Sequence, residues 1–324
     1  MSIPVQNIIR SATRTKDDPL NILWLPKDGV FESLLFPHLP HKFYGGHDVE
    51  TSIWDTIMFP PSSNFYTLAQ HNAFPFSTEF DLIVCNNRMK QAHTAKILSN
   101  VLHIPFMLIE HNVPITHMKI EDIHIAKNEN KANIEVVCDN KINESWKTDS
   151  DIIPYGIPNI YKDNYKNRTN NILLVGKFPD QDYNIVRSIQ QQSKLPIKVL
   201  GDNPTLSKPC TYNDLIHELQ QSKYYLNIST YDGIPPILLL ALSAGCIPIS
   251  NKNPLLKNIL NKDNSYQFDD IDKLYLLLDK ISKVEYTSKS IQANKTIMDT
   301  FPLDKFVKSW TKVFDQFYNW VYTR

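Results

Sequence analysis

The chain has 324 residues, of which 42% are apolar, and its formal net charge at pH 7 is zero. This length predicts two domains of roughly 150 residues each, while the balanced charge argues against a nucleic-acid partner. Residues 1–19 lack the apolar core of a signal peptide and no run of about 18 apolar residues follows, so we expect a cytoplasmic protein.

The first half alternates short apolar runs with polar stretches that favour helices, a pattern typical of a parallel sheet covered on both faces. The predicted strands are residues 22–25, 81–85, 105–109, 133–138 and 151–153, and a helix is predicted over residues 90–102. The region from Phe36 to Phe76 is rich in Pro, His and aromatic residues and has little periodicity. We therefore predict long loops there.

A polar segment, residues 159–170, has no apolar run and is predicted to be an interdomain linker. A second alternation follows, with strands predicted at residues 171–175, 197–200, 224–228 and 247–250, and helices at 213–223, 237–244 and 271–281. The sequence therefore favours two Rossmann-like α/β domains.

The last predicted helix follows Phe301-Pro302 and carries large apolar side chains at spacings of three and four. They are Phe306, Trp310, Val313, Phe314, Phe317 and Val321. Such a face is typical of core packing, which we favour, but an aromatic amphipathic helix can also lie on a membrane. The cations Lys305, Lys308, Lys312 and Arg324 leave weak contact with an anionic membrane open as an alternative.

The most informative segment, residues 229–250, combines a loop, an apolar helix, a tight turn and a buried strand. Asp232 and Gly233 stand just before the helix. The free N–H groups and the positive dipole end of a helix start can bind a phosphate or sugar hydroxyls. Glycine is scarce, with 8 in 324 residues, so Gly156, Gly176 and Gly201 mark further backbone positions that require it.

This segment resembles the donor-binding motif of the retaining "group 1" (family 4-like) GT-B glycosyltransferases, Ser-x-x-Glu-Gly-Phe-Gly-x-x-x-x-Glu-Ala-x-x-x-Gly. Asp232 stands at the first Glu, and Gly233, Ala241 and Gly245 match without a gap. The turns at Gly156, Gly176 and Gly201 also resemble turns of that family, in the same order. The resemblance therefore covers at least residues 150–250.

Two positions depart from the family motif and make its Glu-x7-Glu pattern degenerate. Pro235 replaces a Gly, and Leu240 stands where the second Glu would be, a residue that the family implies to hold the nucleotide ribose. A leucine side chain accepts no hydrogen bonds. The contacts to the ribose must therefore be weakened, rearranged or lost.

The resemblance implies the GT-B fold, in which two Rossmann-like domains face one another across a cleft. Residues 1–160 would form the N-terminal acceptor-side domain, with residues 301–324 packing back on it, and residues 161–300 the nucleotide-sugar-binding domain. The implied activity is a hexosyltransferase-type transfer from a UDP- or GDP-linked sugar to a glycan, lipid-linked or protein acceptor, without a cofactor. Loops between Phe36 and Phe76 would carry the acceptor-specific surface.

The second domain is expected to hold the donor. Lys177 is placed to supply countercharge for the leaving diphosphate, although Asp182 stands where the family has a further Lys. Asp232 is expected to hold the transferred sugar by accepting its hydroxyls, while a helix N-cap is the alternative for Asp232 and a solvated surface lysine for Lys177. The donor-binding set implied in full is Gly176, Lys177, Gly201, Asp202, Tyr212, Asp232, Gly233, Ile234, Pro235 and Leu240.

Three polar residues, Glu110, His111 and Asn112, directly follow a predicted strand of the first domain. They would lie at the carboxyl edge, where doubly wound sheets bind ligands. The resemblance implies a His close to the donor sugar, so His111 and Asp232 are the expected catalytic residues, with a purely structural His111 as the alternative. Glu110 and Asn112 are expected on the acceptor side.

We expect no metal site. The cysteines Cys85, Cys138, Cys210 and Cys246 lie too far apart for a paired-cysteine zinc site and are predicted to be buried, reduced thiols. The run Asp269-Asp270-Ile271-Asp272 is typical of the acidic start of a helix rather than of a metal-binding carboxylate pair.

Other activities stay open. No Gly-x-Gly-x-x-Gly turn is present, which argues against a nicotinamide dehydrogenase, but a nucleotide-sugar epimerase on the same fold is compatible with these residues. A catalytically degenerate GT-B-like binding protein is the alternative from another class. Leu240 is the main argument for it, and Asp232 and Lys177 argue against it.

Overall fold

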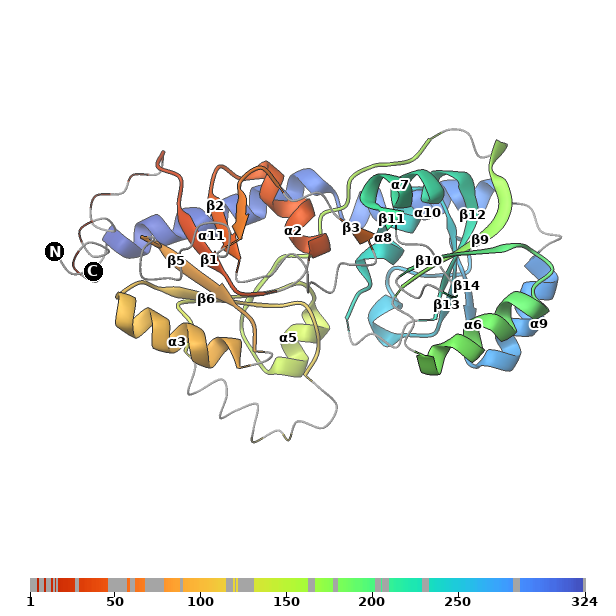
Figure 1. Cartoon of the computed structure of the whole chain (residues 1–324), viewed down its shortest axis with the longest axis horizontal. Coiled ribbons are helices and arrows are strands. Elements are labelled where there is room, and N and C mark those ends of the chain that lie inside the picture. The colour runs from red at the N-terminus through yellow and green to blue at the C-terminus, as the bar shows by residue number, and fades with distance from the viewer. Residues whose placement is uncertain are drawn as a thin grey trace. The chain divides into compact units, whose positions relative to one another are not determined.

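A computed structural model describes the chain outside residues 1–4, 6–8, 10–12, 14, 16, 27–28, 46–56, 59–61, 68–78, 88–89, 115–118, 120, 122–130, 163–166, 177–179, 202–204, 206–209, 229–232, 282–285 and 323–324. The chain divides into two compact units. Unit 1 comprises Met1–Ser52, Pro61–Gly156 and Asp304–Arg324, and unit 2 comprises Ile53–Pro60 and Ile157–Leu303. Each unit is built on a parallel β-sheet flanked by helices (Figure 1).

The described residues of unit 1 form a seven-stranded sheet in the order β4-β2-β1-β5-β6-β7-β8, in which all neighbours are parallel. Its strands are β1 (Asn21–Trp24), β2 (Lys42–Gly45), β4 (Phe65–Thr67), β5 (Leu82–Cys85), β6 (Phe106–Glu110), β7 (Ile134–Val137) and β8 (Asp151–Ile152). Its helices are α2 (Gly29–Leu35), a 3-10 helix (Phe36–His38), α3 (Gln91–Leu102), α5 (Asn140–Trp146) and α11 (Leu303–Tyr322).

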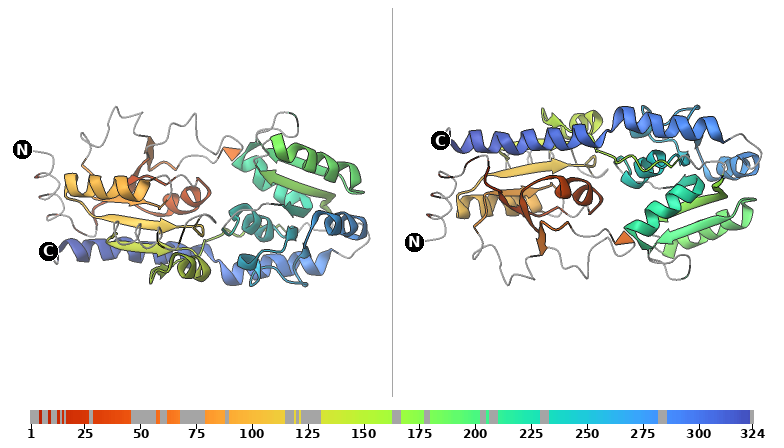
Figure 2. Two further views of the ribbon diagram at one scale, coloured as in Figure 1. Left: turned by 90° about the horizontal axis from the view of Figure 1, so that it is seen from below. Right: turned by 90° about the horizontal axis from the view of Figure 1, so that it is seen from above.

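The two faces of the unit 1 sheet have separate cores, because successive strand residues point to opposite faces. Leu23 of β1 belongs to a cluster with Ala92 and Ala95 of α3. The next residue, Trp24, stacks instead on Phe31 of α2, with ring centroids 6.0 Å apart. Figure 2 shows α3 and α11 on opposite sides of the sheet.

Helix α11 contributes its aromatic face to the second of these cores. Phe306, Trp310 and Phe314 are each at most 3% exposed. Trp310 meets Phe31 edge-on at 5.5 Å, and Phe314 meets Phe43 of β2 at 6.4 Å. The predicted stripe is therefore buried in unit 1 where its side chains are described, from Phe306 to Phe317.

Unit 2 is a five-stranded parallel sheet in the order β10-β9-β12-β13-β14, with a separate two-stranded sheet of β11 and β3, among the described residues. Its strands are β3 (Ile57–Met58), β9 (Thr169–Gly176), β10 (Ile197–Gly201), β11 (Cys210–Thr211), β12 (Ser222–Asn227), β13 (Ile247–Asn251) and β14 (Tyr266–Phe268). Its helices are α6 (Asp180–Gln192), α7 (Tyr212–Gln221), α8 (Pro236–Ser243), a 3-10 helix (Pro254–Leu256), α9 (Ile271–Ile281) and α10 (Thr287–Thr300).

The unit 2 sheet lies between two helical layers (Figure 1). Val186 of α6 and Leu274 of α9 join the cluster on one face of the sheet. On the other face α8 contacts β12, β13 and α10. Helix α8 is apolar on all sides, and its residues 238–242 are 0% exposed, as expected for a helix enclosed by a sheet and a second helix.

The region from Phe36 to Phe76, predicted as long loops, contains regular structure where it is described. β2 and β4 are strands of the unit 1 sheet, and β3 pairs in unit 2. β2 alternates exposed and buried residues, since Lys42 is exposed and Phe43 is buried. An alternation of only four residues near the sheet edge is a weak sequence signal.

The predicted linker, residues 159–170, is in part an element of unit 2. β9 begins at Thr169, and Arg168 is 4% exposed. The guanidinium of Arg168 donates to the carbonyl oxygens of Ser222 (3.4 Å) and Ala244 (2.5 Å), which cap the carboxyl ends of α7 and α8. A cation at the carboxyl ends of two helices is stabilised by both helix dipoles.

No helix in the described part of the chain is both long enough and apolar enough to cross a membrane.

Candidate functional site

The carboxyl edge of the unit 2 sheet holds the described part of the predicted donor site. From β9 the chain passes to β10 on one side and then to β12 on the other, and doubly wound sheets bind ligands at such a switch point. Gly176 and Gly201 end β9 and β10 and are register partners. Because neither has a side chain, a ligand can approach the backbone of both strands closely.

The charged residues predicted to bind the donor, Lys177, Asp202 and Asp232, lie outside the described residues. Gly233 and Ile234, which follow Asp232, are described and buried. They lead directly into α8, so the predicted helix is confirmed.

The start of α8 has fewer N–H donors than the sequence analysis assumed. Pro235 and Pro236 have no N–H group. The carbonyl oxygen of Pro235 accepts the N–H groups of Leu238 (3.1 Å) and Leu239 (3.3 Å). A phosphate at this helix start would therefore depend on the backbone of the preceding loop more than on the first turn of α8.

Leu240 lies within α8 and is 0% exposed, as are its neighbours Leu239 and Ala241. At the position where the resembling family has a ribose-binding Glu, this chain thus has a side chain enclosed by apolar residues. A carboxylate in such surroundings would lose its hydration without a partner, which is unfavourable. The leucine therefore suits this core.

Gly245 serves the turn between α8 and β13. Its φ angle is +82°, and an added Cβ would lie 2.5 Å from the Tyr161 ring and 2.9 Å from the Ser290 hydroxyl. Its carbonyl oxygen accepts hydrogen bonds from Tyr286 (3.0 Å) and Ser290 (2.6 Å). The glycine that matches the end of the family motif thus has a conformational role.

Tyr212 is the first residue of α7, whose start is fixed by a capping box. Thr211 Oγ1 accepts the N–H of Asp214 at 3.2 Å, and the Asp214 carboxylate accepts the N–H of Thr211 at 2.9 Å. Tyr212 is half-buried, and burial raises the pKa of its hydroxyl. The hydroxyl therefore stays protonated at neutral pH and can donate a hydrogen bond.

Two polar residues at this edge were missed by the sequence analysis. Asn227 and Ser250 are register partners at the ends of β12 and β13, 4% and 0% exposed. The Asn227 side-chain amide donates to Ser250 Oγ at 3.0 Å, and Ser250 Oγ donates to the carbonyl oxygen of Asn251 at 3.0 Å. No sequence signal identified them, because each is an ordinary polar residue until the strand register brings the two together.

At the carboxyl edge of unit 1, β2 ends in Gly45, whereas β6 ends in a charged side chain. The chain of this unit passes from β1 to β2 on one side and later to β5 on the other, which makes a switch point. Glu110 ends the neighbouring strand β6 and is 2% exposed. Its carboxylate accepts the N–H of Asn87, which follows β5, at 2.5 Å.

His111 is held between aromatic rings and is 9% exposed. Its ring centroid lies 4.4 Å from that of Phe31 and 5.5 Å from that of Tyr155. The backbone carbonyl oxygen of the next residue, Asn112, accepts the indole N–H of Trp146 at 2.7 Å. Asn112 Oδ1 is buried, and no described residue donates to it.

Glu32 of α2 is a further carboxylate at this edge that the sequence analysis did not single out. It is 9% exposed, and its Oε1 accepts the indole N–H of Trp24 at 2.9 Å. A lone acid inside the apolar run from Val30 to Leu35 was its sequence signal.

The prediction of buried, reduced thiols is confirmed, because all four cysteines are free and buried. Burial raises the pKa of Cys246 to about 12. Burial, followed by the charges of Asp214 and Glu218, raises that of Cys210 to about 11. In the described part of the chain no three His, Cys, Asp or Glu residues are placed to hold a metal ion.

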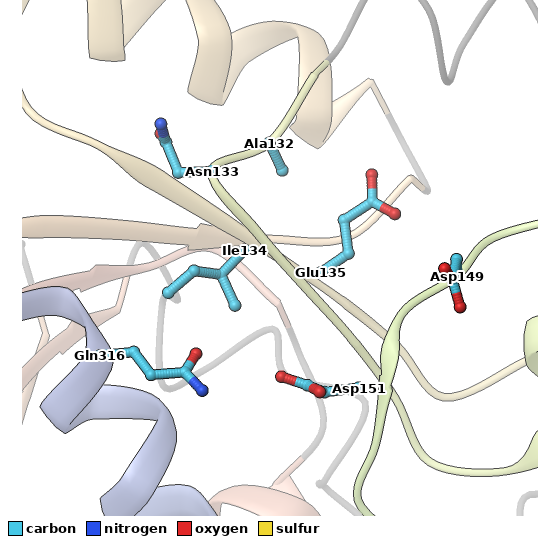
Figure 3. A pocket seen from close by; sticks show the side chains of 7 residues that line it. All are labelled: Ala132, Asn133, Ile134, Glu135, Asp149, Asp151 and Gln316. Carbon is cyan, nitrogen blue, oxygen red and sulfur yellow. The ribbon is translucent and has the colours of Figure 1, made fainter. Parts of the chain in front are cut away.

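A hollow of about 330 Å³ opens at the opposite, amino edge of the unit 1 sheet (Figure 3). Its lining is mostly polar or acidic and comprises Ala132, Asn133, Ile134, Glu135, Asp149, Asp151 and Gln316. These residues lie at the starts of β7 and β8 and on α11. The hollow is therefore separate from the carboxyl edge of this sheet.

Searches for a matching protein-family model and for a similar curated protein gave no match. Solved structures do match. HepE from Anabaena, solved with UDP and glucose, has a TM-score of 0.66 at 12% identity and covers 92% of this chain and 100% of its own. A glycosyltransferase from Rickettsia africae has a TM-score of 0.61 at 11% identity, covering 93% of this chain and 99% of its own.

A third match covers less of both chains. The pneumococcal O-GlcNAc transferase GtfA, solved with UDP and GlcNAc, has a TM-score of 0.56 at 10% identity and covers 73% of this chain and 56% of its own. At these identities the likeness is one of fold. The chain therefore has the predicted fold, two parallel-sheet α/β units of the GT-B type.

Proposed function

We propose that this protein is a glycosyltransferase that moves a sugar from a nucleotide sugar to an acceptor. One observation carries the proposal: the match with HepE, which has been solved with UDP and glucose and with UDP-glucose, covers 92% of this chain. The glycine pair Gly176 and Gly201, at the switch point of the unit 2 sheet, supports it. A nucleotide diphosphate needs such close access to the backbone.

In this proposal unit 2 holds the donor. The diphosphate lies against the ends of β9 and β10, and Lys177 neutralises the charge that develops on the leaving group. Asp232 accepts hydroxyls of the transferred sugar. Tyr212, Gly233, Ile234 and Pro235 would complete the nucleotide site, with Asp202 following Gly201. The donor is a UDP- or GDP-linked hexose, and transfer retains the anomeric configuration as in the family 4-like enzymes that the sequence resembles.

Unit 1 supplies the acceptor side. His111 acts at the donor sugar, and Glu110 and Asn112 bind the acceptor. The Oδ1 atom of Asn112 is a buried acceptor to which no described residue donates, and a hydroxyl of a glycan, lipid-linked or protein acceptor could supply the missing hydrogen. The reaction is proposed to need neither metal nor cofactor and to take place in the cytoplasm. Weak membrane contact through α11 is not part of the proposal, because its aromatic face is buried.

The test is release of nucleotide from a panel of UDP-, GDP- and other activated sugars, with and without EDTA, in the presence of cell-derived acceptors. We expect one UDP or GDP sugar to be consumed, with equal rates after EDTA treatment. Consumption of no donor, together with no binding of UDP or GDP in calorimetric titrations, would contradict the proposal. Loss of activity in EDTA would contradict only the metal independence.

Two variants test the roles of the charged residues. Lys177→Ala should weaken binding of the nucleoside diphosphate by about 10- to 100-fold, because a charge-assisted contact is worth roughly 1.5–3 kcal/mol. It should leave binding of the bare nucleoside unchanged. The N-cap of α8 is Pro235, so Asp232 does not occupy the N-cap position considered from the sequence. Asp232→Asn should lower transfer without lowering thermal stability, whereas a variant that loses stability and keeps turnover would show a purely structural role.

The alternative is a GT-B-like protein that binds a nucleotide without transferring sugar. It is favoured by Leu240, which is fully buried in α8 and accepts no hydrogen bond. Calorimetry and the transfer assay on the same sample separate the two functions. Binding of UDP or GDP without turnover of any donor would establish the alternative.

A further inference from the structure

A segment of the chain lying between two strands of unit 1 forms a strand of unit 2. β2 and β4 are neighbours in the unit 1 sheet. Between them in sequence, β3 pairs in parallel with β11, with Ile57 opposite Cys210 and Met58 opposite Thr211. The same strand also contacts α7, and residues 53–60 belong to unit 2.

The partner strand β11 lies at the ligand-binding edge of unit 2. It comes between the carboxyl end of β10, at Gly201, and the start of α7, at Tyr212. In a parallel β-α-β unit this connection lies at the carboxyl edge of the sheet. Both residues that bound the connection, Gly201 and Tyr212, are in the predicted donor set. β3 therefore lies at the same edge.

β11 is fixed in two ways. At its end, the capping box of Thr211 and Asp214 joins it to α7. Along its side, β3 is its partner in a two-stranded sheet of described residues. Without β3, one side of β11 would lack its ladder hydrogen bonds, and the connection that ends at Tyr212 would be less constrained.

We propose that β3 is a positioning element of the nucleotide site in unit 2, holding β11 so that Tyr212, which directly follows it, is positioned for a nucleoside diphosphate. The inference rests on the proposed function. It assigns to the segment between β2 and β4 a role at the donor nucleotide, where the sequence analysis expected only an acceptor surface.

The geometry of a parallel ladder offers an internally matched test. N–H groups of successive strand residues point to opposite sides, so only one of Ile57 and Met58 directs its N–H at β11. Proline removes the N–H while keeping an extended backbone. The single variants Ile57→Pro and Met58→Pro therefore both introduce a proline, but only one removes a hydrogen bond of the ladder. Ile57→Val and Met58→Leu are conservative controls.

The probes are UDP and GDP in calorimetric titrations, with amide hydrogen exchange at residues 57–58 and 210–211. We expect the bound nucleotide to slow exchange in both strands together. One proline variant should weaken nucleotide binding by about 3- to 10-fold, the change that corresponds to one hydrogen bond. The other proline variant and both controls should bind like the unchanged protein.

Three results would overturn the inference. Equal effects of the two proline variants would show that the ladder hydrogen bond is irrelevant. Nucleotide protection of β11 without protection of β3 would show that the strand only packs there. If the unchanged protein bound neither UDP nor GDP, the proposed function itself would fail, and this inference with it. That result is distinct from a failure of the inference alone, in which the unchanged protein binds nucleotide and only the variants differ from expectation.

Discussion

The carboxyl edges of the two sheets are built from different material. In unit 2 the strands β9 and β10 end side by side in Gly176 and Gly201. In unit 1, β2 also ends in a glycine, Gly45, but the end of β6 is filled with side chains: Glu110 is 2% exposed, and His111 is enclosed by the rings of Phe31 and Tyr155. The ends of β9 and β10 offer backbone to a ligand, and the end of β6 offers fixed functional groups.

The two kinds of site therefore tolerate different substitutions. A site made from backbone groups is damaged when an atom is added, because the added methyl group occupies the space of the ligand. A site made from packed side chains is damaged when an atom is removed, because the remaining groups lose their positions.

The largest effect is expected for Phe31, whose ring contacts Trp24, His111 and Trp310 and which is 1% exposed. Phe31→Ala should lower the free energy of unfolding of unit 1 by about 3–5 kcal/mol, because it leaves a cavity under His111. Phe31→Leu should cost less, about 1–1.5 kcal/mol. Denaturant titrations monitored by Trp fluorescence measure both, and equal costs would show that the ring is not the centre of this packing.

The next effect separates a glycine needed by the fold from glycines that face a ligand. Gly245→Ala should destabilise unit 2 by about 3 kcal/mol, because the residue has a positive φ and the new Cβ would meet the Tyr161 ring. Thermal unfolding measures the loss. A variant as stable as the unchanged protein would mean that the turn can rearrange.

Alanine substitutions of the two glycines at the sheet edge should instead weaken UDP binding and leave stability almost unchanged. Among the described glycines φ is positive only at Gly245, so Gly176→Ala and Gly201→Ala keep an allowed backbone and should change stability by less than about 0.5 kcal/mol. Each should weaken UDP binding about tenfold, or ~1.4 kcal/mol. Undiminished UDP affinity in both variants would show that the backbone at Gly176 and Gly201 does not contact the nucleotide.

The smallest effect concerns the interior of unit 2 and is seen only at alkaline pH. Burial raises the pKa of Cys246 from 9.0 to about 12. The unfolded thiol loses its proton first, so its contribution to stability is complete below pH 9 and is lost as the pH rises towards 12. The cost of Cys246→Ala should therefore be about 1 kcal/mol smaller at pH 10 than at pH 8. An identical cost at both pH values would indicate a hydrated interior.

The parts of the fold that could be predicted are those where local pattern and final environment agree. The apolar run of β6 predicted a buried strand, and all five of its residues are buried. The apolar run before Gly245 predicted α8 and its turn. β2 was missed because its pattern is short, and α10 because its buried face consists of Ser290, Ala293 and Ile297, two of them small residues without a strong hydrophobic period.

The candidate site could be predicted only where a single residue type, glycine, marks a position by its rarity in this chain. Scarce glycines located Gly176 and Gly201, which the fold places side by side. The Asn227–Ser250 pair could not be found, because each residue is an ordinary polar residue until the register brings them together. Arg168 was assigned to a linker because its neighbours in sequence are polar. Its hydrogen-bond partners Ser222 and Ala244 lie 54 and 76 residues later in the chain, so local sequence could not reveal them.

Helix α11 has a consequence for the order in which the protein can be completed during translation. Phe306, Trp310 and Phe314 pack in unit 1, yet they follow the whole of unit 2 in the chain. While the ribosome makes residues 157–303, the sheet of unit 1 has already been synthesised but its aromatic face has no cover. Synthesis of unit 1 therefore begins first and ends last. Until α11 is made, the exposed aromatic rings of unit 1 form a surface that chaperones can bind and through which the chain can aggregate.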